Sequence, residues 1–309
     1  MQKIKILSVN VSEKKGTVKK PVNSIELCEI GVRNDAHSGT WHRQVSLLGK
    51  ESFEKFSLEA KREIQYGEFA ENITTEGVVL YKTSPLDVFK NQDLELMVTQ
   101  IGKKCHGDGC AIYREVGNCV MPKEGIFAKV IRGGILKAGD VLEYHPKVYK
   151  VKIITLSDRA SSGEYQDLSG PEIEKIITAH FEKVNKLIEV EVVVIPDDEE
   201  QLRQLCLMDK DQYDVIITTG GTGIGPRDIT PDVVRPLLDK EIPGIMEVIR
   251  VRYGMEKPNA SLSRSIAGIM GGTLVYTLPG SVKAVREYMD EILKTLEHLV
   301  YMQYGLDVH

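Results

Sequence analysis

The stretch TTGGTGIGPRD, residues 218–228, places four glycines within six residues. The apolar run Tyr213–Ile217 before it favours a buried strand, and the residues after it favour a helix capped by Thr230. A strand, a glycine-rich loop and a helix together present backbone N–H groups and a positive dipole end to an anion, most often a phosphate. A tight turn without a ligand is the alternative. The missing Lys-Ser or Lys-Thr excludes a Walker loop, and the glycine spacing excludes the dinucleotide fingerprint.

The glycine-rich loop belongs to a series of predicted strands and helices in the second half of the chain. The strands fall at Val151–Leu156, Val190–Ile195, Val215–Thr218, Ser265–Ile269 and Thr273–Leu278. Their alternation with helical segments predicts an open α/β sheet with crossover helices. Ligands of such sheets bind beyond the carboxyl ends of the strands. The polar segments at those ends are Ser157–Gly163, Asp197-Asp198, the loop through Arg227 and Asp228, and Pro279-Gly280-Ser281.

Two serines are predicted to start helices in this half. Ser169 and Glu172 have the spacing of a capping box, in which both side chains bond to free backbone amides at the helix start. Ser281 is predicted to cap one long final helix, whose apolar residues continue at helical spacing to Leu299. Further helices are predicted over Glu199–Met208 and Ile242–Tyr253.

Residues 1–147 have a different pattern, in which short apolar runs are separated by glycines. One helix is predicted from Leu47 to Lys61, with Phe53, Phe56 and Leu58 on its apolar face. The pattern predicts a mostly β domain, a barrel or folded sheet with helical additions. The predicted strands are Ile4–Val9, Gly16–Val22, Ser24–Leu27, Val78–Tyr81, Leu94–Thr99, Gly125–Val130 and Val141–Tyr144.

Length and composition limit the class of protein. A chain of 309 residues predicts two domains, here residues 1–147 and 148–309. The hydrophobic content of 42% and the charged content of 28% are ordinary for soluble globular proteins. No segment has the basic stripe of a nucleic-acid binder, and no apolar run of about 18 residues could span a membrane. The first residues lack a signal-peptide pattern, so we expect a cytoplasmic protein.

Five cysteines predict thiol chemistry rather than a disulfide framework, because the count is odd and the expected compartment is reducing. Cys105, Cys110 and Cys119 fall close together in the sequence. Two lysines and a histidine surround Cys105, and such cations favour the reactive thiolate. An inert buried thiol is one alternative. A zinc or iron–sulfur site is another, although the spacing Cys-x4-Cys-x8-Cys is unusual for zinc.

Three stretches of the first half together resemble a known module. They are DAHSGTWHRQVSLL from Asp35, GEFAEN from Gly67 and MPKEGIFA from Met121. With these stretches, nearly all of residues 3–145 resemble a MOSC domain, the module named after the C-terminal part of molybdenum cofactor sulfurases. The resemblance implies a β-barrel-like fold and a cysteine that binds or carries sulfur for the molybdenum cofactor, with Cys105 as the best candidate.

The first of those stretches also contains candidate ligand-binding side chains. His37, His42 and Arg43 could bind an anionic cofactor. They could equally form a polar network that ties a loop to the barrel.

Residues 150–309 carry a second resemblance, to the molybdopterin adenylyltransferase family. The matching motifs are SDRASSGEYQD at 157–167, IPD at 195–197, TTGGTG at 218–223, RDITPD at 227–232, SR at 263–264 and LPG at 278–280. The resemblance implies that an adenylyl group passes from ATP to molybdopterin with release of pyrophosphate. Ser281 departs from the family pattern, in which plant members carry Asn and the bacterial enzyme carries Gln. A related bacterial branch of debated activity also carries serine there.

The second resemblance implies roles for the residues at the predicted strand ends. Asp197 and Asp228 fall on the family's key acids and suit a Mg²⁺ ion, which prefers one or two carboxylates together with phosphate oxygens. The glycine-rich loop would hold a phosphate, and nearby arginines would neutralise developing charge. The predicted binding residues are Ser157, Asp158, Arg159, Ser161, Ser162, Ser169, Gly220, Gly221, Thr222, Gly223, Arg227, Ser263, Arg264, Pro279, Gly280 and Ser281.

The two resemblances predict a molybdopterin adenylyltransferase whose first half binds the cofactor or carries sulfur. The expected ligands are Mg²⁺, ATP and molybdopterin or the molybdenum cofactor. The expected partners are a metal-insertion protein and molybdoenzymes, with no nucleic acid or membrane, and family resemblance also implies a homotrimer. One alternative is a catalytically silent cofactor carrier or scaffold with a sulfur-carrying cysteine. A molybdate or tungstate storage protein is the other.

Overall fold

The structure is a computed structural model that describes residues 2–104 and 120–306. Its contacts divide the chain into two compact units, one of residues up to Lys147 and one of Val148–Tyr304. No helix in these described ranges is long and apolar enough to cross a membrane. Cys105, the predicted sulfur carrier, lies outside the described residues, as do Cys110 and Cys119.

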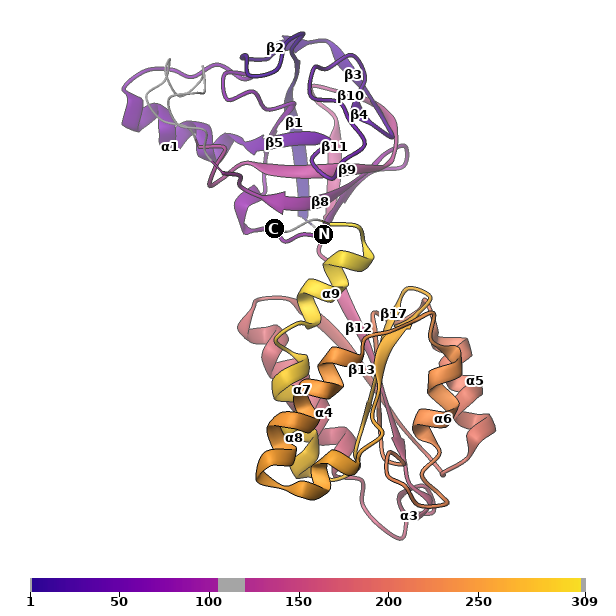
Figure 1. The fold of residues 1–309 in the computed structure, drawn as a ribbon. Coiled ribbons are helices and arrows are strands. Elements are labelled where there is room, and N and C mark those ends of the chain that lie inside the picture. The colour runs from indigo at the N-terminus through magenta and orange to yellow at the C-terminus, as the bar shows by residue number, and fades with distance from the viewer. Residues whose placement is uncertain (1, 105–119, 307–309) are drawn as a thin grey trace. The chain divides into compact units, whose positions relative to one another are not determined.

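Seven strands of the first unit close into a barrel, which confirms the predicted fold class (Figure 1). The unit contains β1 (Gln2–Val11), β2 (Lys20–Val22), β3 (Ser24–Cys28), β4 (Gly31–Val32), β5 (Val45–Gly49), α1 (Lys50–Ala60), β6 (Ile73–Glu76), η1 (Leu80–Lys82), β7 (Val88–Lys90), β8 (Glu95–Ile101), β9 (Ile126–Arg132), β10 (Gly134–Lys137) and β11 (Val141–His145). The order around the barrel is β11-β7-β8-β9-β5-β6-β1, and β1 pairs with β11 to close the ring. Strand β2 pairs with the last residues of β1, and a smaller sheet has the order β10-β3-β4.

Alternating side chains fill the barrel. In β1, Ile4 and Ile6 are buried and the neighbouring Lys3 and Lys5 are exposed, as the two-residue period of a strand requires. The core contains apolar side chains from strands all round the ring. Burial of this surface is the main source of stability for the unit.

Two predictions for the first unit are wrong. Leu47 and Leu48 belong to β5, and helix α1 begins only at Lys50. Strand β5 is buried on both faces, so its continuous apolar run has the same pattern as a buried helical segment. Leu58 is 81% exposed rather than inward-facing. The predicted strand Val78–Tyr81 instead leads into the 3-10 helix η1.

The second unit is an open α/β sheet with crossover helices, as predicted. Its elements are β12 (Val148–Leu156), α3 (Asp158–Ser161), α4 (Ser169–Lys183), β13 (Leu187–Ile195), α5 (Glu199–Asp209), β14 (Val215–Thr219), α6 (Thr230–Val234), η3 (Arg235–Leu237), β15 (Lys240–Glu241), α7 (Pro243–Glu256), η4 (Pro258–Leu262), β16 (Ala267–Met270), β17 (Thr273–Leu278), α8 (Val282–Ile292) and α9 (Leu296–Gln303). The sheet order is β13-β12-β14-β17-β16-β15. The first four strands are parallel, β16 pairs antiparallel with β17, and β15 pairs antiparallel with β16.

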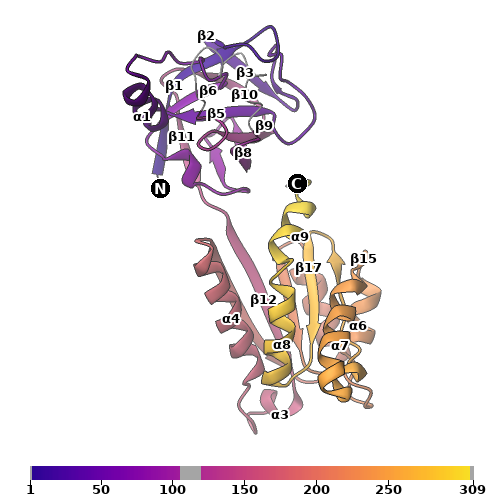
Figure 2. The ribbon, with the colours of Figure 1, turned by 60° about the vertical axis from the view of Figure 1, so that its left-hand side comes forward.

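Helices cover both faces of this sheet. Helices α4, α7 and α8 lie on one face and α5 and α6 on the other (Figure 1). Helix α3, which follows β12 directly, lies at the carboxyl end of the parallel strands (Figure 2). The polar segments singled out in the sequence therefore follow strands that end on the same side of the sheet.

Helix starts and ends differ from prediction in three places. The carboxylate of Asp167, not a Ser169 capping box, accepts the backbone N–H groups of Ser169 and Gly170 at the start of α4. Thr230 is the first residue of α6 rather than its cap, because its hydroxyl donates to the Gly220 carbonyl. The final helix is two helices, since the chain turns after α8, where the Thr295 hydroxyl donates to a carbonyl at the end of that helix.

Candidate functional site

Two aspartates meet where the parallel strands β12 and β13 end. The backbone N–H of Asp197 donates to Asp158 Oδ1 at 3.0 Å, and the N–H of Asp158 donates to Asp197 Oδ2 at 3.4 Å. This reciprocal pairing is possible because the two strands are adjacent and in register, with Leu156 opposite Ile195. Two of the predicted residues, 39 positions apart in sequence, are thereby in contact.

The glycine-rich loop brings a third aspartate and an arginine to the same place. Arg227 forms an ion pair with the Asp158 carboxylate. Asp228 Oδ2 accepts the backbone N–H of Gly225 at 2.8 Å, which fixes the carboxylate against its own loop. The ends of β12, β13 and β14 thus contribute Asp158, Asp197 and Asp228, which we call the aspartate cluster.

The charges of the aspartate cluster influence one another. Burial is the main cause that raises the pKa of Asp197 above its ordinary value, and the carboxylates of Asp158 and Asp228 act in the same direction. Arg227 opposes the shift. Crowded carboxylates of this kind are stabilised when a cation binds between them, because the cation offsets their mutual repulsion. Asp158 is already neutralised by Arg227, which leaves Asp197 and Asp228 as the acids that fit a divalent ion.

The protein would supply only part of a metal coordination shell here. Within the ranges that the structure covers, no group of three or more His, Cys, Asp and Glu side chains is arranged to hold a metal ion. Two carboxylates with water and phosphate oxygens are nevertheless the usual donors for Mg²⁺. The arrangement therefore fits a metal ion that arrives with a phosphate-bearing ligand.

The glycine-rich loop packs so tightly that side chains are excluded. Gly220 has φ of 106°, and a Cβ atom there would overlap the Leu156 carbonyl oxygen. Gly221 has φ of 60°, and a Cβ atom would lie 2.6 Å from Thr230 Oγ1. Gly280, from the predicted segment after β17, packs against Gly220. Close backbone packing in left-handed conformations is the physical reason for glycine at these positions.

Arg264 was predicted to neutralise charge on a ligand, but its guanidinium is bound to groups of the protein. Its Nε donates to the Gly223 carbonyl at 2.7 Å, and its guanidinium also donates to the backbone carbonyl of Asp228. The remaining nitrogen contacts both carboxylate oxygens of Asp232 at 2.8 Å. The backbone N–H of Arg264 donates to the Thr222 carbonyl at 2.9 Å. Arg264 is therefore a positioning residue that holds the loop carrying Asp228.

Replacement of Arg264 by methionine is expected to loosen this loop. Loss of charged hydrogen bonds to two backbone carbonyls should lower the free energy of unfolding by about 2 kcal/mol and speed hydrogen exchange in residues 222–228. Arg235→Met is the matched control, because the Arg235–Glu241 ion pair is exposed and should contribute less than about 1 kcal/mol. Chemical denaturation and hydrogen-exchange mass spectrometry measure the two effects. Equal losses in both variants would contradict the positioning role.

The other predicted residues of Ser157–Gly163, the segment that follows β12, organise the short helix α3. Ser157 Oγ accepts the Ala160 N–H at 3.2 Å and caps the helix. Ser161 donates to the Asp158 carbonyl, and Ser162 donates to the Arg159 carbonyl. Arg159 is exposed, with its guanidinium 5.7 Å from the centre of the Tyr165 ring.

Four further predicted residues are engaged in local structure. Ser169 is buried and donates its hydroxyl to Asp167 at 2.9 Å. The Ser263 hydroxyl contacts that of Thr222 at 3.5 Å. The Pro279 carbonyl accepts a hydrogen bond from Thr219, and Ser281 Oγ accepts the Ala284 N–H at 3.3 Å. Ser281 therefore caps α8 as predicted.

The first unit contains a cavity of about 660 Å³. Its described lining includes four basic side chains and no acidic one. The basic side chains are Lys15, His37, Arg43 and Lys103, and the aromatic ones are Trp41, Phe69 and Phe127. A cavity with this charge and these rings fits an anionic ligand with a flat or apolar part. Lys15 was missed in the sequence because nothing in its local pattern separates it from an ordinary surface lysine.

Arg43 is held between two aromatic rings in this cavity. Its guanidinium carbon lies 4.0 Å from the centroid of the Trp41 ring and 5.6 Å from that of Phe127. Burial lowers the pKa of Arg43 from its ordinary value, and its buried Nε has no hydrogen-bond partner within the described ranges. A desolvated guanidinium with an unused donor is suited to a phosphate or carboxylate ligand.

His42 is not among the residues that line this cavity. It is absent from the described cavity lining, its Nε2 lies 3.2 Å from Gln100 Oε1, and its carbonyl accepts a hydrogen bond from Thr99. Of the two interpretations of the histidines, the polar network that ties a loop to the barrel applies to His42.

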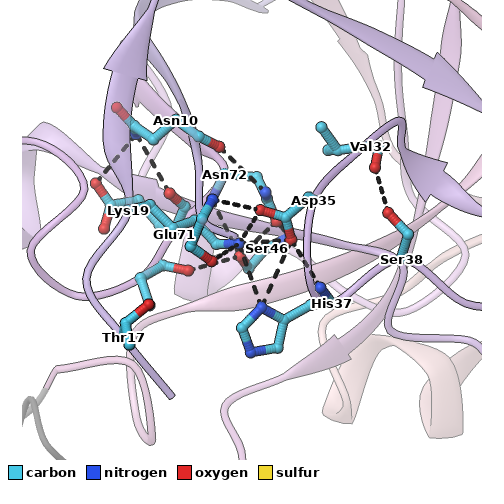
Figure 3. Close-up of polar contacts among 12 residues, drawn as sticks. Asn10, Thr17, Lys19, Val32, Asp35, His37, Ser38, Ser46, Glu71 and Asn72 are labelled. Carbon is cyan, nitrogen blue, oxygen red and sulfur yellow. Dashed lines mark hydrogen bonds and ion pairs between the residues drawn. The ribbon is translucent and has the colours of Figure 1, made fainter. Parts of the chain in front are cut away.

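A buried ion pair lies beside His37, one of the residues that line the cavity (Figure 3). Lys19 Nζ lies 2.6 Å from Asp35 Oδ1 and 2.5 Å from Asp35 Oδ2, and both side chains are at most 2% exposed. Asp35 also accepts the backbone N–H groups of Ser12 and His37. Although burial raises the pKa of Asp35, the nearby side chains of His37 and Lys19 and the backbone N–H of Ser12 hold it well below its ordinary value. The sequence did not indicate this pair, since Lys19 stands in a charged run typical of the surface.

Comparison with known proteins finds a family match in each half of the chain. A family model described as a probable molybdopterin binding domain matches residues 152–298, and one described as a MOSC domain matches residues 34–143. The molybdopterin adenylyltransferase of Helicobacter pylori J99 is 35% identical over 159 residues, which are 50% of this chain and 88% of that protein. That of Pyrococcus furiosus is 40% identical over 162 residues, 50% of this chain and 91% of that protein. Gephyrin of Dictyostelium discoideum is 40% identical over 157 residues, 48% of this chain, and the match spans 22% of gephyrin.

Proposed function

The chain belongs to the molybdopterin adenylyltransferase family through its second half, and on this premise we propose that it transfers the adenylyl group of ATP to molybdopterin. The observation that carries the proposal is the aspartate cluster beside the glycine-rich loop. Exposed backbone amides bind phosphate, and carboxylates hold the metal ion that neutralises it. A site with only the backbone amides or only the carboxylates would fit many phosphate ligands.

The reaction is an adenylyl transfer. A phosphate oxygen of molybdopterin forms a bond to the α-phosphorus of ATP, the bond from that phosphorus to the oxygen bridging to the β-phosphate breaks, and pyrophosphate leaves. Such reactions depend on positioning and on neutralisation of charge. The backbone N–H groups of Gly221, Thr222 and Gly223 would hold a phosphate group, whereas that of Gly220 donates to the Leu278 carbonyl at 2.9 Å. Arg227 and Arg159 are exposed cations near the carboxyl ends of the parallel strands. They would neutralise charge on the leaving pyrophosphate.

A Mg²⁺ ion bound with ATP would supply neutralisation of the phosphate oxygens. Asp197 and Asp228 are the residues that would hold it. Only one oxygen of the Asp228 carboxylate is used by the Gly225 amide, and Asp197 lies in a region where added positive charge is favourable. Arg264 would keep Asp228 in place during this step without touching either substrate.

A steady-state assay of pyrophosphate release tests the proposal. The purified chain, given molybdopterin and ATP, should release pyrophosphate only when both substrates and Mg²⁺ are present. Release that is independent of molybdopterin would indicate a simple ATP hydrolase. No release despite tight binding of molybdopterin would favour the second candidate, a cofactor carrier, for which the basic cavity of the first unit is the supporting observation.

We propose that the first unit binds the pterin product or the finished cofactor in its basic cavity, with Arg43 on the phosphate. Wild-type chain should then bind two equivalents of molybdopterin, one in each unit. Arg43→Ala should leave one equivalent, as measured by equilibrium dialysis. Arg33→Ala is the matched control, because Arg33 pairs with Glu26 on an exposed surface, and it should keep both. Two equivalents in the Arg43 variant would contradict this assignment.

Sulfur transfer is the finer part of the proposal for the first unit. Lys103 lies in the cavity lining, two positions before Cys105 in the sequence. A persulfide on Cys105, detected by mass spectrometry after incubation with a persulfide donor whose outer sulfur passes to the Cys105 thiolate and which leaves as a thiol, would support the sulfur-carrying role. A Cys105→Ser variant gives the control for the assignment of the added mass.

A further inference from the structure

We propose that the buried Lys19–Asp35 pair is a positioning device that holds His37 as a neutral imidazole with its Nε2–H presented to the basic cavity. This inference rests on the proposal that the cavity binds an anionic ligand. His37 would then be a hydrogen-bond donor to a ligand oxyanion, rather than a metal ligand or a base. Neither Lys19 nor Asp35 lines the cavity, so both act through the imidazole.

The geometry around one ring nitrogen carries the inference. His37 Nδ1 lies 3.4 Å from Lys19 Nζ and 3.5 Å from Asp35 Oδ1. The side chains of Lys19 and Asp35 are almost fully buried, whereas that of His37 is 40% exposed. In Figure 3 the second ring nitrogen points away from the pair. One edge of the imidazole thus faces a fixed buried charge pair, and His37 itself lines the cavity.

The chemistry of the neighbours decides which nitrogen carries the proton. An ammonium group only donates hydrogen bonds, so it favours an unprotonated Nδ1 as its acceptor. The Asp35 carboxylate is already occupied by Lys19 and by the backbone N–H groups of Ser12 and His37. A proton on Nδ1 would therefore face the ammonium at 3.4 Å without an unused acceptor. The stable neutral form carries its proton on Nε2.

The charges around His37 are mostly positive. Lys19 Nζ is the nearest charged atom to Nδ1, at 3.4 Å, and Lys15, Arg43 and Lys103 line the same cavity as His37. An outward Nε2–H adds a hydrogen-bond donor for an oxyanion to this cationic lining.

The tautomer can be measured directly on the full-length wild-type chain. Protein labelled with ¹⁵N-histidine should show His37 with the nitrogen shift of an unprotonated Nδ1 and a protonated Nε2 near neutral pH. The signal is assigned by its loss in His37→Gln. A protonated Nδ1 in the wild type would overturn the inference, whatever the cavity binds.

Variants then connect the tautomer to ligand binding, with inorganic phosphate as the probe. Lys19→Met/Asp35→Asn removes both charges together but keeps an acceptor for the backbone N–H groups, which avoids leaving one buried charge unpaired. It should give a mixture of His37 tautomers and bind phosphate about tenfold more weakly. Lys19→Arg should keep the wild-type tautomer. An unchanged tautomer and an unchanged affinity in the double variant would overturn the positioning role.

The proposed anion site has its own control in the same titration. Arg43→Ala should weaken phosphate binding and leave the His37 tautomer unchanged. If phosphate causes no change in the wild-type His37 signal, the anion-binding proposal fails and the donor role of His37 fails with it. If phosphate binds while Nδ1 is protonated, only the positioning inference fails.

Discussion

Asp228→Asn is expected to lower the rate of adenylyl transfer by about 10³-fold while the fold is retained. The amide can still accept the Gly225 N–H, so the loop should keep its shape. It cannot supply the negative charge that holds a divalent ion beside Asp197. The loss should therefore appear in the rate, and should be partly relieved by high Mg²⁺ concentrations. Initial rates of pyrophosphate release across a magnesium titration measure both effects.

Asp198→Asn is the matched control for this experiment. Asp198 directly follows Asp197 and caps α5, where its carboxylate accepts the Gln201 N–H at 2.7 Å. Asparagine is an equally good cap, so stability and activity should stay near those of the wild type. Full activity of Asp228→Asn, or an equal loss in Asp198→Asn, would contradict the assignment of Asp228 as a metal ligand.

Gly220→Ala is expected to have the largest effect on stability, at about 3 kcal/mol or more for the second unit. The residue has φ of 106°, and the added Cβ would overlap the Leu156 carbonyl oxygen at the end of β12. Neither the strand nor the loop can move without disturbing the aspartate cluster. Activity should fall together with stability.

Gly163→Ala separates the backbone strain of a positive φ from the steric overlap of the added Cβ atom, which together destabilise Gly220→Ala. Gly163 also has a positive φ, 80°, but nothing lies within 4 Å of a Cβ atom placed there. Its substitution should show the backbone strain alone, about 1 kcal/mol. Denaturation of the second unit, followed by circular dichroism, compares the variants. Similar losses for both glycines would show that close packing of the loop is not important.

The parallel part of the second unit could be predicted well from sequence. Its strands are short apolar runs bounded by turn residues, and the polar residues that follow them come together because parallel strands end on one side. The contact between Asp158 and Asp197 is an example: register alone places them together. The chemistry assigned to them came from motif resemblance, since two turn aspartates have no pattern of their own.

Positions that depend on tertiary packing could not be predicted in this way. The last three residues of β5, from Leu47 on, were assigned to a helix because a strand buried on both faces loses the alternation that identifies it. Arginine is a residue type that often binds phosphate, yet two backbone carbonyls and Asp232 occupy the guanidinium of Arg264. The Lys19–Asp35 pair joins a charged run to a distant loop, and no local pattern indicates such a contact.

Formation of adenylyl-molybdopterin by the second unit can be measured in a single turnover. Excess protein reacts with molybdopterin and ATP, with Mg²⁺ or with a chelator, and the bound products are analysed by mass spectrometry. We expect one adenylyl-molybdopterin and one pyrophosphate per ATP consumed, with Mg²⁺ only. Intact ATP beside fully bound molybdopterin in the presence of Mg²⁺ would contradict this expectation.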